Sequence, residues 1–156
     1  MEISELFNAI RNEEVTAVSR LLKENPSWVN EKDARGSTPL LLATYYGFEE
    51  IAKEILKFPQ NINAQDASGN TALMGVCFKG YDSLAALLLK HKANVNTSNF
   101  NGATALIFAA TFKQVDIIKM LLENGADTTA KDDRGNTALD HAKMQGLTVV
   151  IALLEN

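Results

Sequence analysis

Residues 36–47, GSTPLLLATYYG, place a short apolar run between two glycines and end it with a pair of tyrosines. The pattern returns as GNTALMGVCFKG at residues 69–80, as GATALIFAATFK at 102–113 and as GNTALDHAKMQG at 135–146. The opening glycines, at 36, 69, 102 and 135, are 33 residues apart each time. A constant spacing of that length predicts an array of repeated units, each packed against its neighbours.

Each copy carries the signals of two short helices. A threonine two residues after the opening glycine can accept a hydrogen bond from an early backbone N–H, as an N-cap does. Pro39 suits the first helical position, where its missing N–H does no harm. In the second helix, apolar residues at i, i+1, i+4 and i+5 share one face. The candidate N-caps are Thr38, Thr71, Thr104 and Thr137, the glycines expected to close the first helix are Gly47, Gly80 and Gly146, and one copy of the apolar face is Ile117, Ile118, Leu121 and Leu122.

A unit of this size cannot bury its apolar faces alone, so the units must stack. We predict one all-α domain over residues 1–156, made of five units. Residues 1–32 form an N-terminal capping unit, 33–65, 66–98 and 99–131 form full repeats, and 132–156 form a short C-terminal capping unit. Terminal units are expected to be modified, because an exposed stacking face would aggregate.

The segment that opens each unit resembles the ankyrin repeat family. DARGSTPL at residues 33–40 matches the family's pattern of Asp, two variable residues, Gly, one variable residue and Thr-Pro-Leu. DASGNTAL, NFNGATAL and DDRGNTAL follow with Ala in place of Pro, and the resemblance covers nearly the whole chain. It implies an ankyrin-repeat solenoid, an L-shaped stack of antiparallel helix pairs from which hairpin-like finger loops project at right angles.

Three departures from the family pattern affect the expected packing. The histidine that usually follows Thr-Pro-Leu is replaced by Leu41, Met74, Ile107 and Asp140, so its hydrogen-bond network is lost or replaced. Lys113 stands where the other copies have glycine, so either it is left-handed, at about 1–2 kcal/mol, or the helix continues. Gly75 lies inside a helix, and we expect the ring of Phe108, one repeat on, to fill the space above it.

The resemblance implies that the first helix of each unit lines a concave groove, with the last residues of that helix facing it. The tyrosines of the first copy then begin two columns of groove residues, and two parallel columns run along the finger tips. Tyrosine, phenylalanine, methionine and arginine are enriched at protein interfaces. The predicted partner-binding residues are Tyr45, Tyr46, Phe78, Lys79, Thr111, Phe112 and Met144 in the groove and Arg35, Phe100, Asn101 and Arg134 on the fingers. The alternative is that the aromatics pack against their own fingers and that Phe100 folds onto a neighbouring finger.

Composition excludes several other classes of function. Fifteen basic and nineteen acidic residues give a net charge of −4, without the basic stripe that nucleic acid requires. The first residues lack a signal peptide, and no apolar run reaches the 18 residues of a membrane span. The single cysteine, Cys77, suits a reducing compartment. We therefore expect a soluble cytoplasmic monomer.

No arrangement of residues points to catalysis. The two histidines, His91 and His141, fall at different positions in their units, and Cys77 lies two units before His141. Two unpaired histidines do not make a metal site, and no phosphate loop or catalytic triad spacing occurs. The sequence therefore predicts a module that binds a partner protein and has no catalytic residues, metal or cofactor. The alternative is an inhibitor or regulatory subunit that covers the active site of a partner enzyme.

Overall fold

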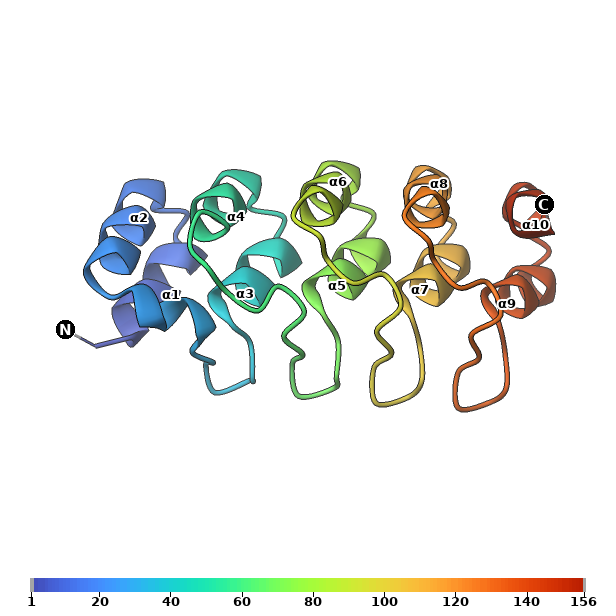
Figure 1. The fold of residues 1–156 in the computed structure, drawn as a ribbon, viewed down its shortest axis with the longest axis horizontal. Coiled ribbons are helices and arrows are strands. Elements are labelled where there is room, and N and C mark those ends of the chain that lie inside the picture. Colours follow the sequence, from blue (N-terminus) through green and yellow to red (C-terminus); the bar gives the residue numbers. More distant parts are fainter. Residues whose placement is uncertain (1, 156) are drawn as a thin grey trace.

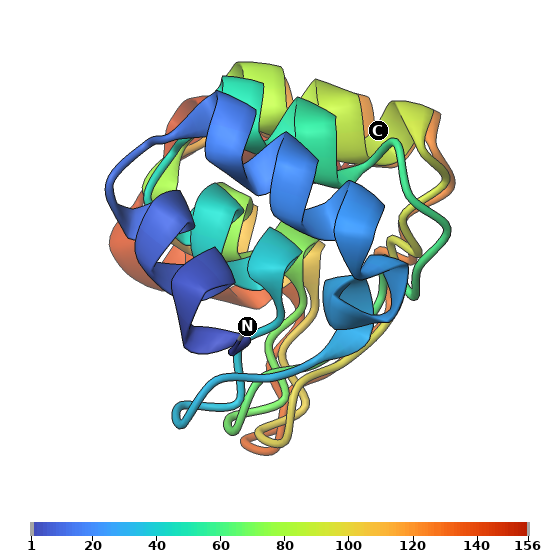
Figure 2. The same cartoon turned by 90° about the vertical axis from the view of Figure 1, so that its left-hand side faces the viewer.

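Helix pairs stacked side by side make up the computed structural model, which describes residues 2–155 (Figure 1). Helices α1, α3, α5, α7 and α9 form one row and α2, α4, α6, α8 and α10 form a second row above it. Viewed along the stack, the loops before α3, α5, α7 and α9 extend at an angle to both rows (Figure 2). The helices are α1 (Ser4–Arg11), α2 (Val15–Glu24), α3 (Pro39–Tyr45), α4 (Glu49–Ile55), α5 (Ala72–Lys79), α6 (Asp82–Lys90), α7 (Ala105–Thr111), α8 (Val115–Glu123), α9 (Ala138–Gln145) and α10 (Thr148–Glu155), with a 3₁₀ helix, η1 (Pro26–Asn30), after α2.

The predicted all-α solenoid is confirmed, and none of residues 2–155 lies in a β-strand. Each first helix packs on the first helix of the next unit and on the second helix of its own unit. The core is the double layer between the two rows, and the apolar face expected for the second helices packs there, with Leu122 of α8 only partly buried. In α8, Ile117, Ile118 and Leu121 are fully buried. The division into five units remains a prediction, and its outer limits, Met1 and Asn156, lie outside the described residues.

All four candidate N-caps are confirmed. Each threonine Oγ1 accepts a hydrogen bond from the backbone N–H three residues later, at 3.1–3.3 Å. The position of the missing histidine is used differently from unit to unit. Asp140 Oδ2 accepts a hydrogen bond of 2.9 Å from the N–H of Thr137, and Met74 Sδ accepts a weak one of 3.5 Å from the N–H of Thr71. In α5 and α9, Met74 and Asp140 therefore accept a hydrogen bond from the backbone N–H of the N-cap threonine, in place of the usual histidine.

Lys113 adopts the left-handed conformation, with φ at 60°, in place of the glycine found in the other copies. Its counterparts Gly47, Gly80 and Gly146 have φ values of 75°, 79° and 66°. The structure therefore decides between the two expected outcomes: α7 ends before Lys113, and that lysine carries the backbone strain.

The finger loops are turns closed by an aspartate or asparagine at their first position. Its Oδ1 accepts hydrogen bonds of 2.9–3.0 Å from the N–H groups two and four residues later. Asp33, Asp66, Asn99 and Asp132 are the four residues that do this. Neighbouring fingers are joined by backbone hydrogen bonds from Phe100 to Ser68 and from Asp133 to Asn101. The fingers are therefore held at fixed spacing beside the first helices.

A column of asparagines ties the units together on the side of the links. Asn30 Oδ1 accepts a hydrogen bond of 3.2 Å from the N–H of Asn61, and Asn63 and Asn96 repeat this contact at 2.8 Å one and two units later. Within residues 2–155, no helix is long and apolar enough to cross a membrane.

Candidate functional site

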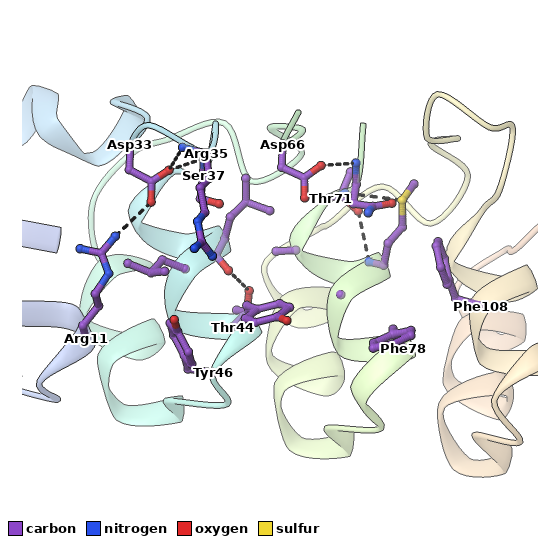
Figure 3. Close-up of a pocket in the computed structure, with 17 residues that line it drawn as sticks. Arg11, Asp33, Arg35, Ser37, Thr44, Tyr46, Asp66, Thr71, Phe78 and Phe108 are labelled. Atoms are coloured by element: carbon purple, nitrogen blue, oxygen red, sulfur yellow. Dashed lines mark hydrogen bonds and ion pairs between the residues drawn. The ribbon is translucent and has the colours of Figure 1, made fainter. Parts of the chain in front are cut away.

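A hollow of about 610 Å³ lies between the fingers and the helices α3 and α5 (Figure 3). Its apolar walls come from α3, α5 and α7, and its polar rim comes from the fingers before α3 and α5. Lining residues include Leu42, Met74, Gly75, Phe78 and Phe108 on the apolar side and Asp33, Arg35, Asp66 and Asn70 on the rim. A hollow therefore lies on the predicted groove side, lined mainly by residues of the first two full repeats.

Gly75 is where this hollow opens, and the expectation that the ring of Phe108 covers it is wrong. A methyl group added at Gly75 would meet no heavy atom within 4 Å beyond its own local backbone. Phe108 lines the same hollow from α7 but leaves the space above Gly75 empty. The space beside Gly75 is therefore open to the hollow.

The aromatic residues predicted at the ends of the first helices are neither buried nor fully exposed. Tyr45, Tyr46, Phe78 and Phe112 keep 42–52% of their surface accessible. The rings of Tyr45 and Tyr46 meet edge to face at 5.5 Å, and Lys79 Nζ lies 4.5 Å above the Tyr45 ring. Phe78 and Phe112 meet edge to face at 4.7 Å. The contacts of Lys79 with Tyr45 and of Phe78 with Phe112 join neighbouring units, whereas the Tyr45–Tyr46 pair lies within one unit.

Two of the predicted groove residues, Thr111 and Met144, are not aromatic. The hydroxyl of Thr111 donates a hydrogen bond of 2.7 Å to the carbonyl of Ile107, so it is already used within α7. Met144 is 63% exposed on α9. The exposed aromatic residues among the predicted groove residues therefore lie at the ends of α3, α5 and α7, and the last unit contributes a methionine.

The predicted finger residues do not form one site. Arg35, Asn101 and Arg134 are exposed at the tips of the first, third and fourth fingers, and of the three Arg35 alone lines the hollow. Phe100 is 67% exposed and lies against Gly69 of the preceding finger, as the alternative expectation had it. It lines a second hollow, of about 490 Å³, whose other walls include the links before α3 and α5. The structure thus separates Phe100 from the groove aromatics.

The acidic finger residues, which the sequence pattern did not mark as site residues, differ in the use of their second oxygen. Asp33 Oδ2 lies 3.4 Å from Arg11 Nη2, and Asp132 Oδ2 lies 2.7 Å from His141 Nε2. Burial opposes the ionisation of Asp132, but the N–H of Asn136, the His141 side chain and the N–H of Arg134 outweigh it and hold the pKa of Asp132 below its usual range. Asp66 Oδ2 has no hydrogen-bond or ion-pair partner among residues 2–155, and Asp66 lines the hollow.

The nucleophilic and titratable residues named above do not form a reactive cluster. Cys77 is completely buried in α5, and burial raises the pKa of its thiol, which lowers its reactivity. Helix α7 lies between α5 and α9, which carries His141. Among residues 2–155, no three His, Cys, Asp or Glu side chains lie together as metal ligands would.

Comparison with known proteins agrees with this geometry. A family model described as ankyrin repeats (3 copies) matches residues 45–132 and 98–156, which together cover more than half of the chain. Among curated proteins, no sequence is similar enough to match.

Proposed function

The chain belongs to the ankyrin repeat family, and we propose that it binds a partner protein through the hollow between α3 and α5 and the aromatic side chains beside it. Ankyrin repeats are in general protein–protein interaction modules and are typically non-catalytic. In this proposal the chain acts as a cytoplasmic monomer, takes no metal or cofactor and binds neither nucleic acid nor membrane. Its role is to present a rigid surface.

One observation supports the groove as the binding face. Tyr45, Tyr46, Phe78 and Phe112 each expose about half of their surface. Phe78 contacts Phe112 of the next unit, and Tyr45 contacts both Tyr46 in its own unit and Lys79 of the next one. Large aromatic side chains that are already ordered give extensive contact area at a small cost in conformational entropy. Exposed aromatic surface of this extent, rimmed by polar residues, is typical of interaction sites.

The experiment compares the wild-type chain with Tyr46→Ala/Phe78→Ala/Phe112→Ala as bait in a lysate of the source cell. Val149→Ala serves as the matched control, because Val149 is an exposed apolar residue on α10, away from the groove. Circular dichroism verifies that every variant is folded. Truncation of interface hot spots removes about 2 kcal/mol or more each, so a partner retained by wild type should be lost by the triple variant alone.

Retention of the same partner by the triple variant would refute the groove as the binding face. In that case Phe100→Ala, in the second hollow, is the next variant to compare. If the partner is an enzyme, its activity at stoichiometric addition separates an inhibitory or regulatory role, in which activity falls, from a scaffold, in which it does not.

A further inference from the structure

The first residue of each finger repeats at 33-residue intervals, yet the four copies do not have equivalent surroundings. In every copy, Oδ1 of this first residue closes the turn by accepting hydrogen bonds from two backbone N–H groups. The rest of the side chain faces the groove side, where Asn99 donates a hydrogen bond of 2.9 Å to Asn70 Oδ1. Asp33 and Asp132 each face a basic side chain, at 3.4 Å and 2.7 Å. Asp66 is the copy whose second oxygen, Oδ2, has no hydrogen-bond or ion-pair partner among residues 2–155.

Asp33 is paired with Arg11 and Asp132 with His141, but the residues at the equivalent positions around Asp66 do not contact its Oδ2. His141 follows Asp132 by nine residues (141−132), and the residue nine after Asp66 is Gly75 (75−66). Arg11 precedes Asp33 by 22 residues (33−11), and the residue 22 before Asp66 is Thr44 (66−44). The Thr44 hydroxyl is buried and donates a hydrogen bond of 2.9 Å to the carbonyl of Leu40. Asp66, whose Oδ2 has no partner, and Gly75, which has no side chain to supply one, therefore line the same hollow.

The last unit shows which chemistry satisfies this position. There the side chain of His141 approaches the second oxygen of Asp132 through a planar N–H group. A planar cation from outside could make the same contact with Asp66 through the space that Gly75 leaves open. The walls of the hollow suit its apolar stem, because Met74, Phe78 and Phe108 line it. Guanidinium groups stack on aromatic rings and hydrogen-bond carboxylates with two donors at once.

We propose that the hollow above Gly75 receives an arginine side chain of the partner protein. The guanidinium donates to Asp66 Oδ2, and its stem packs between Met74 and Phe78. This inference rests on the proposed function, since it names the side chain that the groove recognises.

Arg35 allows a test of whether the hollow prefers a cationic or an anionic side chain. It lines the same hollow and forms no ion pair within residues 2–155. An incoming cation is repelled by Arg35, whereas an incoming anion is attracted by it. Removing the Arg35 charge should therefore strengthen the binding of an arginine and weaken the binding of a carboxylate.

The test is an NMR titration of the ¹⁵N-labelled full chain with N-acetyl-arginine N′-methylamide. The citrulline compound of the same shape but without charge is the control ligand. We expect the arginine compound to shift the amide signals of Asn70 and Gly75 and the citrulline compound to shift them much less. Asp66→Asn should weaken binding by about tenfold or more, because a charge-assisted hydrogen bond is lost. Gly75→His should block the hollow, and Arg35→Ala should tighten binding.

Each variant is expected to fold, so that a change in binding reports on the hollow itself. Asn99 closes its finger with the same two backbone hydrogen bonds, so Asp66→Asn should keep the turn. Histidine is already accommodated at the equivalent position 141, so Gly75→His should fold as well. Asp116→Asn, which removes one exposed charge at the start of α8, is the control for net charge. Dispersed ¹H–¹⁵N spectra verify each fold.

Equal binding of both compounds, undiminished binding by Asp66→Asn, or weaker binding by Arg35→Ala would each overturn the proposal. Its failure is distinguishable from failure of the proposed function. A partner lost by the aromatic triple variant but bound with full affinity by Asp66→Asn would refute the arginine site and leave the groove as the binding face. A partner retained by the triple variant would refute the groove, whatever the small compound shows.

Discussion

Two glycines at the same place in their units allow the contact between neighbouring fingers to be measured. Gly69 and Gly135 have φ values of 82° and 80°, so alanine at either position carries about 1–2 kcal/mol of left-handed strain. A Cβ at Gly69 would also lie 2.7 Å from the backbone nitrogen and from Cδ1 of Phe100. A Cβ at Gly135 would meet nothing within 4 Å.

Gly69→Ala should therefore lose more stability than Gly135→Ala. The added Cβ forces Phe100 to move, which weakens its backbone hydrogen bond of 3.2 Å to Ser68, worth about 1 kcal/mol. Overpacking adds about 1–3 kcal/mol. We expect the free energy of unfolding of Gly69→Ala to fall roughly 2 kcal/mol further than that of Gly135→Ala, which at a typical slope is a difference of about 1 M urea.

The assay is urea unfolding followed by circular dichroism at 222 nm and by the fluorescence of Trp28. Coincident transitions from the two probes test whether the stack unfolds as one unit, which repeat arrays do not always do. Equal losses of stability for the two alanine variants would refute the argument, because they would show that the contact between Phe100 and the preceding finger adds no constraint.

Three further outcomes follow from single residues. Gly75→Ala should raise the free energy of unfolding by up to about 1 kcal/mol, because a helical residue gains a methyl group in open space; a lower urea midpoint would contradict this. Lys113→Gly should raise it by up to about 1 kcal/mol, since about 1–2 kcal/mol of left-handed strain exceeds the extra flexibility of glycine in the unfolded chain; an unchanged midpoint would contradict this. The pKa of Asp132 is lowered by folding, so its ionised form adds stability above the unfolded pKa of about 4, and that stability is lost as the pH falls through the lower folded value. Asp132→Asn should accordingly lose less stability than wild type as the pH falls below about 4, and parallel acid-unfolding curves would show that the argument is wrong.

The fold could be predicted because the segment that encodes one helix pair occurs four times in the sequence. A threonine N-cap and a glycine at the end of a short helix are weak signals alone, but their recurrence at 33 residues makes chance agreement implausible. All four caps are present in the structure. Where one unit departed from the pattern, at Lys113, the sequence left two outcomes open, because strain in one residue is small beside the packing of a whole helix.

The candidate site was less accessible to sequence reasoning. The position within the repeat indicates which residues share a column, and in the structure Tyr45 contacts Tyr46 and Phe78 contacts Phe112. It did not tell whether a side chain leans over its neighbour, and so the ring of Phe108 was wrongly placed above Gly75. The free oxygen of Asp66 was missed because its two possible partners come from different helices, one before and one after the finger. The signal was nonetheless present, since His141 and Gly75 occupy the same position in their units.

The asparagine column on the side of the links determines how such a chain can change in length. Asn30, Asn63 and Asn96 each accept from a backbone N–H 31 residues later, in the following unit. A duplicated segment of 33 residues therefore brings one new acceptor and one new donor, and both meet their counterparts at the two new junctions. Gene duplication or engineering can extend the stack, and with it the groove, without designing a new interface.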